Sequence, residues 1–203
     1  MLILPATYLP DIEYVARLIT AGDDYIIDCG ENYIKRSVRN RTTIMTANGT
    51  LDLTVPVVNA NRPRTPMSRM QIDYSKPWQH QHWVAILSAY RSSPYFDMLA
   101  ERLEGFYTAH HTSLVEFNLA ILRTLLDFMG YTAPLRTSDT YITANEGDID
   151  LRPKHRTTEF TTPHYFQLFS DRIPFAENLS ILDLLMSEGV YARQLLDNQR
   201  IKR

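Results

Sequence analysis

Short apolar runs and one helical repeat alternate over the first 28 residues. Residues 2–4 form an apolar run that Pro5 stops, and residues 24–28 form a second run with strand character. Between the two runs, apolar residues recur at helical spacing: Ile12, Val15, Ala16 and Ile19. Pro10 suits the first helical position, where a missing N–H costs nothing, and Gly22 suits the end. Strand, helix and strand in so short a span predict a βαβ unit with parallel strands.

The next segment has the pattern of a β-hairpin. Residues 42–46 and 51–55 are strand-like, and Asn48-Gly49 lies between them. An Asn-Gly pair between two such runs is a strong hairpin signal, because both turn positions are expected to need positive φ. The polar stretch 56–66 that follows, rich in Asn, Arg and Pro, is predicted to be an exposed loop.

Three helical patterns fill the segment from residue 77 to residue 130. The first two have apolar residues at helical spacing and are separated by Ser92-Ser93-Pro94. The third opens at Ser113 with Glu116 three residues later, which is a capping box, and Gly130 ends it. We therefore predict an α/β fold over residues 1–203 as one domain. It has a mixed sheet, a βαβ N-terminal unit, a hairpin excursion and a helical layer; an α+β arrangement is the alternative.

The segment from residue 144 to residue 163 is polar and has no regular pattern. It contains a second group of basic residues: Arg152, Lys154, His155 and Arg156. Long segments of this kind often serve as lids, so we interpret 144–163 as a candidate mobile loop. A last short helix is predicted at residues 180–187, with Gly189 after it.

Composition adds bounds on location and class. The chain has 203 residues, 44% of them hydrophobic and 22% charged, which is typical of a globular protein. Its first residues are too short an apolar run for a signal peptide, and no apolar run approaches the roughly 18 residues of a membrane span. The single cysteine, Cys29, excludes an intrachain disulfide. These features predict a cytoplasmic protein without a membrane span.

The strongest functional signal is the basic cluster Lys35-Arg36-Ser37-Val38-Arg39-Asn40-Arg41. Four of its residues are cationic, although the chain has 21 Lys and Arg against 23 Asp and Glu and a net charge of −2. The cluster follows the end of a predicted parallel strand, where ligands of open α/β sheets bind. We therefore predict that Lys35, Arg39 and Arg41 bind a phosphorylated small molecule or nucleotide sugar, with Asn40 orienting it. Pairing of these cations with nearby carboxylates, Glu31 among them, remains the structural alternative.

Two further side chains are candidates for the site. Tyr8 precedes the first helix and is predicted to line the pocket, and His82 is the candidate catalytic base because an imidazole at a core boundary can titrate near neutrality. His80 and His82 would project to different sides of a helix, so we assign no metal. Cys29 precedes the cationic cluster, which could lower its pKa, although a small buried residue is the simpler interpretation.

Segments along nearly the whole chain, from Leu2 to about Leu196, resemble the WbqC-like proteins of bacterial surface-polysaccharide gene clusters. The segments that carry the resemblance are Leu4-Pro5 with Tyr8-Leu9-Pro10, Glu31-Asn32-Tyr33, Lys35, Arg39-Asn40-Arg41, Asn48-Gly49, Leu53-Thr54-Val55-Pro56, Trp78, His82-Trp83, Tyr90, Ser93-Pro94-Tyr95-Phe96, and Asn178 to Leu185 with Gly189. The resemblance implies a transferase of O-antigen or capsule assembly. Such an enzyme would attach an aminoacyl group (glycine) or an acyl group to a nucleotide-linked amino sugar.

Two other functions stay open from the sequence. The strand, Tyr-x-Pro, helix opening is similar in topology to nucleotide-binding domains that form adenylates, and a non-catalytic protein that binds nucleotide sugars would need the same cations. No nucleic-acid partner is expected, because the basic residues form short clusters in a slightly acidic chain. The sequence leaves open the cofactors and a homodimer through the aromatic helices between Trp78 and Tyr95.

Overall fold

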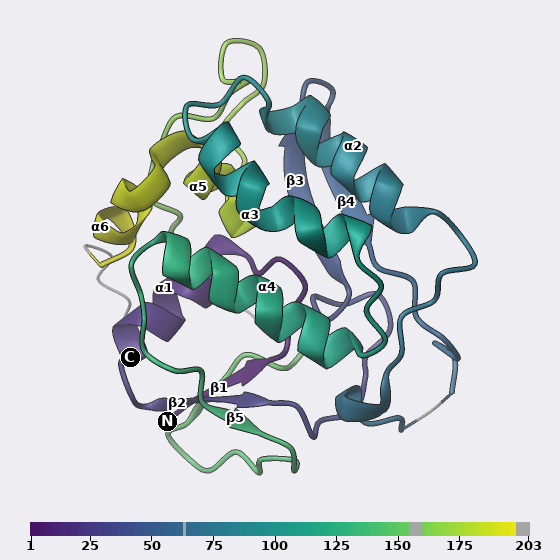
Figure 1. Ribbon diagram of the computed structural model, residues 1–203. Helices are drawn as coiled ribbons and strands as arrows, with labels where there is room; N and C mark the ends of the chain where they lie inside the picture. Colours follow the sequence, from purple (N-terminus) through teal and green to yellow (C-terminus); the bar gives the residue numbers. More distant parts are fainter. Residues whose placement is uncertain (63, 155–159, 198–203) are drawn as a thin grey trace.

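The computed structural model describes residues 1–62, 64–154 and 160–197, and Figure 1 shows the arrangement of its elements. Its strands are β1 (Leu2–Pro5), β2 (Tyr25–Asp28), β3 (Arg41–Thr46), β4 (Gly49–Thr54), β5 (Thr137–Ser138) and β6 (Ile149–Asp150). Its helices are α1 (Ile12–Ala21), α2 (Trp78–Tyr90), α3 (Phe96–Thr108), α4 (Leu114–Phe128), α5 (Ile181–Glu188) and α6 (Ala192–Asp197). Two 3₁₀ turns complete the list, η1 (Met67–Arg69) and η2 (Gly189–Tyr191).

A parallel sheet with the strand order β5-β2-β1-β6 forms the base of the fold. Leu2 of β1 pairs with Tyr25 of β2, and α1 connects the two strands, so the predicted βαβ unit is confirmed. The two outer strands have only two residues each, and neither was predicted from the sequence. One of them, β6, lies within the segment 144–163 that we interpreted as a mobile loop.

The first helix begins at Ile12, two residues later than its sequence predicted. Asp11 is the N-cap, because its Oδ1 accepts a hydrogen bond of 2.8 Å from the backbone N–H of Tyr14. Pro10 therefore lies just outside the helix and not at its first position. Gly22 ends the helix at a φ of 59°, as expected for a residue that must adopt a left-handed conformation.

Strands β3 and β4 form a separate antiparallel hairpin, in which Thr46 pairs with Gly49. The hairpin prediction is confirmed, but the predicted turn conformation is wrong. Gly49 has a φ of 104°, whereas Asn48 is not among the residues with positive φ. The glycine therefore supplies the left-handed position alone, and the side chain of Thr46 stabilises the turn by donating a hydrogen bond of 2.7 Å to the Gly49 carbonyl.

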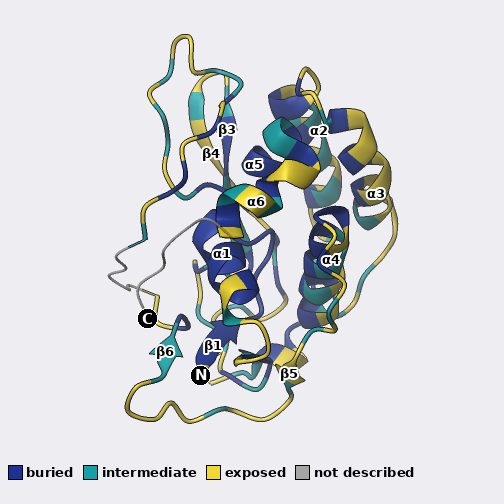
Figure 2. Ribbon diagram, turned by 90° about the vertical axis from the view of Figure 1, so that its left-hand side faces the viewer, coloured by how far each residue is buried: buried dark blue, intermediate teal, exposed yellow. Residues whose placement is uncertain are grey.

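Helices α2, α3 and α4 form one layer on the side of the molecule seen at the right of Figure 2. Their inner faces are buried and their outer faces exposed, as the helical spacing predicted. Ser113 caps α4 by accepting a hydrogen bond from the N–H of Glu116. The α/β class with a helical layer between residues 77 and 130 is thus confirmed. In the described part of the chain, no helix has the length and apolar character needed to cross a membrane.

Backbone hydrogen bonds bring three distant segments together beyond the end of β1. The N–H of Tyr8 donates to the carbonyl of Val38 at 3.0 Å, and the N–H of Ile12 donates to the carbonyl of Leu179 at 3.0 Å. The N–H of Ser180 donates to the carbonyl of Thr43 at 2.8 Å. The loop after β1, the start of β3 and the start of α5 therefore share one region of the structure.

Candidate functional site

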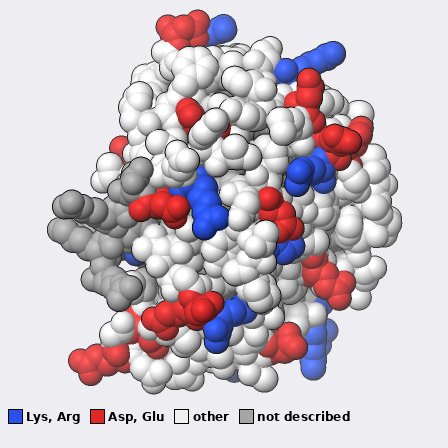
Figure 3. Space-filling view, turned by 60° about the vertical axis from the view of Figure 1, so that its left-hand side comes forward, with Lys and Arg blue, Asp and Glu red and all other residues white. Residues whose placement is uncertain are grey.

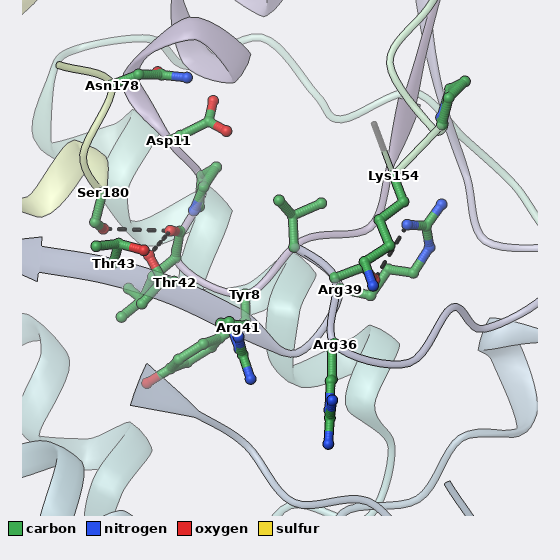
Figure 4. Close-up of a pocket in the computed structure, with 15 residues that line it drawn as sticks. Tyr8, Asp11, Arg36, Arg39, Arg41, Thr42, Thr43, Lys154, Asn178 and Ser180 are labelled. Carbon is green, nitrogen blue, oxygen red and sulfur yellow. Dashed lines mark hydrogen bonds between the residues drawn. The ribbon is translucent and has the colours of Figure 1, made fainter. Parts of the chain in front are cut away.

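A pocket of about 230 Å³ lies where these three segments meet (Figure 4). The loop after β1, the basic cluster, the start of β3, the end of the segment after β6 and the start of α5 all contribute to it. Its lining residues are Tyr8, Leu9, Pro10, Asp11, Arg36, Ser37, Val38, Arg39, Arg41, Thr42, Thr43, Pro153, Lys154, Asn178 and Ser180. The position at the carboxyl end of β1 is the one at which open parallel sheets bind ligands.

Three lining cations are available to a ligand. Arg36 and Lys154 are exposed, and neither has an ion-pair partner among the described residues. Arg41 is 36% exposed and contacts Asp52 at 3.3 Å and the Thr54 hydroxyl at 3.2 Å, an exposed pair that a stronger anion can replace at low cost. Figure 4 shows the side chains of Arg36 and Arg41 extending in the same direction. The pocket therefore favours an anionic group.

Arg39, which the sequence suggested as a phosphate ligand, is completely buried. Its guanidinium donates to both carboxylate oxygens of Glu31, to the hydroxyl of Ser37 at 3.3 Å and to the carbonyl of Arg152 at 2.9 Å. Figure 4 shows it turned away from Arg36 and Arg41. For this residue, the structural alternative of pairing with a nearby carboxylate describes the contacts that are present.

The other two residues predicted from the cluster lie outside the pocket lining. Lys35 is exposed, and its Nζ donates to the Oδ1 of Asn61 at 2.6 Å. Asn40 is buried, and its Nδ2 donates to the carbonyl of Val55 at 2.8 Å. The structure thus brings Tyr8, Arg39 and Arg41 of the predicted set to one pocket, and it leaves Lys35, Asn40 and His82 outside its lining.

A buried network of charged groups supports the floor of the site. Arg152 donates to Asp28, to Asp150 and to the carbonyl of Ile142, and its carbonyl accepts from Arg39. Burial raises the pKa of Glu31 to about 7, although the Arg39 guanidinium beside it acts to lower this pKa. This network ties the end of β2, the basic cluster and the segment after β6 into one unit. It therefore fixes the backbone from which Arg36 and Lys154 extend.

Among the described residues, His82 is connected to the pocket lining through Tyr8. The Nδ1 of His82 lies 2.9 Å from the Tyr8 hydroxyl, which also lies 2.9 Å from the hydroxyl of Tyr107. All three side chains are buried, so this cluster lies beneath the pocket wall. Burial lowers the pKa of His82 to about 4 and raises the pKa of Tyr8 far above its usual value. At neutral pH the imidazole is therefore uncharged and acts as a hydrogen-bond partner of the tyrosine.

Other chemical groups near the site are held in unreactive forms. The Cys29 thiol is buried, and burial followed by the nearby carboxylates raises its pKa to about 12, so the lowered pKa that the cationic cluster suggested is not found. Within residues 1–62, 64–154 and 160–197, no group of three or more His, Cys, Asp or Glu side chains is arranged to hold a metal ion.

Among the pocket residues, Arg36, Lys154, Asn178 and Ser180 were not predicted from the sequence to belong to the site. Lys154 belongs to the second basic group, so its charge was visible in the sequence but its proximity to the first cluster was not. His155 and Arg156 of that group lie outside the described residues. On the face seen in Figure 3, Lys and Arg side chains lie among Asp and Glu side chains. The expectation that no nucleic acid binds stays a prediction.

Comparison with known proteins identifies the family. The model of the WbqC-like protein family matches residues 6–157. The chain is also 31% identical over 140 residues to the uncharacterized protein Rv1507c of Mycobacterium tuberculosis. The aligned region covers 68% of this chain and 60% of the relative. It thus spans less than two thirds of that relative's length, and no solved structure matches it. Because the family model covers well over half of the sequence, the chain belongs to the WbqC-like protein family.

Proposed function

We propose that this protein is a transferase of bacterial surface-polysaccharide biosynthesis that attaches an aminoacyl or acyl group to a nucleotide-linked amino sugar. In this proposal the pocket binds the phosphate of one substrate. The observation that carries it is the gathering of Arg36, Arg41 and Lys154 around one cavity at the carboxyl end of β1. The proposal includes a cytoplasmic location, which the single cysteine favours.

In this proposal the residues around the pocket have different roles. Arg36, Arg41 and Lys154 bind the phosphate, because their charges are accessible and at most weakly paired. Arg39 and Asn40 hold the backbone of the cluster in place through their buried hydrogen bonds. His82 acts as a positioning residue for Tyr8, since its contact with the pocket runs through that hydroxyl.

Transfer to an amino sugar is compatible with this set of residues. The neutral amine of the acceptor is itself the nucleophile: its nitrogen forms a bond to the acyl carbon, and the bond from that carbon to the donor's leaving group breaks with its electron pair. The proton that the nitrogen loses passes to the leaving group or to water. The protein then needs to hold two substrates in contact and to neutralise the leaving group. A pocket that is rich in cations and contains no described Cys or His is consistent with that requirement.

A non-catalytic protein that binds nucleotide sugars is the second candidate. It is favoured by the same absence of Cys and His among the lining residues described, and by the raised pKa of Cys29. Such a protein would use the pocket for recognition alone.

A binding screen separates these functions. Thermal shift and calorimetry should be run with nucleotide sugars, ATP, and acyl or aminoacyl donors, followed by mass spectrometry of the sugar. Binding of one donor and one acceptor with a mass increase on the sugar supports the transferase. Pyrophosphate release from ATP and a carboxylic acid would instead identify adenylate formation, and binding of one nucleotide sugar without turnover would identify the binding protein.

Charge-removing variants test the pocket itself. Arg36→Gln and Arg41→Gln should each lower the affinity for the nucleotide sugar by roughly tenfold, because each removes a charge-assisted hydrogen bond to phosphate. Arg91→Gln is the matched control, because Arg91 is an exposed arginine at the end of α2, outside the pocket lining. If the pocket variants bind like Arg91→Gln while remaining folded, the phosphate site is not in this pocket.

A further inference from the structure

A second pocket, of about 270 Å³, lies in the loop that follows β4 and beside the 3₁₀ turn η1. Three arginines supply its charged lining: Arg62, Arg64 and Arg69. The other lining residues are Val58, Asn59, Thr65, Pro66, Met70 and Gln71. No Asp or Glu is among the described residues that line it, so the pocket is more one-sidedly positive than the first, which contains Asp11.

The three guanidinium groups have no ion-pair, hydrogen-bond or ring partner among the described residues. All three side chains are exposed, so each retains its full set of five N–H donors for a ligand. Like charges grouped around one cavity repel each other, and an anion with several oxygens is the ligand that relieves this repulsion. Arg39 and Arg152 differ from these three arginines, because their N–H groups donate hydrogen bonds within the protein.

We infer that this second pocket binds the diphosphate group of a phosphorylated small molecule. A diphosphate presents several oxygens over a short length, and planar guanidinium forks bind such oxygens two at a time. The Gln71 side chain also lines the cavity and carries a polar group of the kind that orients a bound anion. The Thr65 hydroxyl donates a hydrogen bond of 3.2 Å to the carbonyl of Arg62 and so fixes the loop that carries the arginines. The cavity suits a small charged group better than a long chain, because its described lining comes from one short segment of the chain, between Val58 and Gln71.

The second pocket is structurally connected to the first. The segment 31–36 contacts the loop of the second pocket at three points: the carbonyl of Glu31 accepts from Met67, the N–H of Tyr33 donates to Thr65, and Lys35 donates to Asn61. The next residue, Arg36, lines the first pocket. Given the proposed function, on which this step rests, the two pockets would hold the two phosphorylated substrates of one transfer.

Inorganic pyrophosphate is the probe for this site. Calorimetric titration of the wild-type chain should show two binding sites, and Arg64→Gln/Arg69→Gln should lose one of them or weaken it by roughly a hundredfold. Arg36→Gln/Arg41→Gln should leave that site intact. Arg91→Gln/Arg102→Gln removes the same net charge from α3 and the end of α2 and serves as the control for long-range electrostatics.

The outcomes separate this inference from the proposed function. If Arg64→Gln/Arg69→Gln binds pyrophosphate at both sites like the control, the second site is overturned whatever happens at the first. If the wild-type protein binds pyrophosphate at a single site, and only Arg64→Gln/Arg69→Gln abolishes this binding, the second pocket is supported as the diphosphate site. The phosphate site proposed for the first pocket is then refuted. Tight, strongly salt-dependent binding of a single-stranded oligonucleotide with no binding of pyrophosphate would also overturn the inference. Unchanged circular dichroism shows that the variants are folded.

Discussion

Replacement of His82 by glutamine should change how the stability of the protein depends on pH. The imidazole is 5% exposed, bonded to Tyr8, and has a pKa of about 4 instead of 6.5. Between pH 6.5 and pH 4 the unfolded chain therefore binds a proton at this residue and the folded chain does not. Protonation favours the unfolded state over this range, so the wild-type protein loses stability as the pH falls through it and the loss is complete near pH 4.

The size of the effect follows from the difference between the two pKa values. At 1.36 kcal/mol for each pH unit, the step from 6.5 to about 4 corresponds to about 3 kcal/mol. Other titrating groups also change the stability over this range, but they are present in both proteins. The informative quantity is therefore the difference between wild type and His82→Gln. This difference should shift by about 3 kcal/mol between pH 7 and pH 4 in favour of the variant.

Urea unfolding followed by tryptophan fluorescence at several pH values between 7 and 4 measures this difference, since Trp78 and Trp83 lie on the same helix as His82. His80→Gln is the matched control because His80 is exposed on that helix, and its unfolding free energy should stay within about 0.5 kcal/mol of wild type throughout. If wild type and His82→Gln lose stability in parallel, the imidazole titrates normally and the assignment of a buried neutral ring is wrong. An NMR titration of the His82 ring protons gives the same pKa directly.

Three further changes test the parts of the fold that hold the site. Arg39→Met should destabilise the protein by about 3–5 kcal/mol because it leaves the buried Glu31 without its partner, as chemical unfolding would measure. Gly30→Ala should lower the melting temperature, since an added Cβ would lie 2.3 Å from the backbone of Thr140, and an unchanged value would contradict this close approach. Ser113→Ala should cost about 1 kcal/mol in the same unfolding assay through loss of the α4 cap.

The elements that could be predicted from sequence are those with local signals. The βαβ unit, the hairpin and the helices of the layer each have their own periodicity, cap or turn residue, such as Ser113 for α4 and Gly49 for the hairpin. The short strands β5 and β6 have only two residues each, too few for a repeat to be visible. They are strands because they pair with β2 and β1, which are distant in sequence, and no local pattern records that pairing.

The region of the candidate site was predictable, but the role of each cation within it was not. The position of the basic cluster after a parallel strand indicated a pocket at that edge. Which arginine faces the pocket depends on contacts that are far apart in sequence: Arg39 is held by Glu31 and by the carbonyl of Arg152. Lys154 reaches the pocket because β6 pairs with β1, which the polar composition of its segment did not reveal.

Burial explains why Arg36 and Arg41, and not Arg39, are the cations that a ligand can use. To bind a phosphate, Arg39 would have to give up its bidentate pair with Glu31 and leave that carboxylate buried alone, at a cost of about 3–5 kcal/mol. Arg36 has no partner to give up among the described residues, and Arg41 gives up an exposed contact worth at most about 1 kcal/mol. The binding of an anion of moderate affinity can offset the loss of the exposed Arg41–Asp52 contact, but it cannot offset the loss of the buried Arg39–Glu31 pair. Arg39 therefore fixes the shape of the cluster, and its exposed neighbours Arg36 and Arg41 are the cations that we propose bind the ligand.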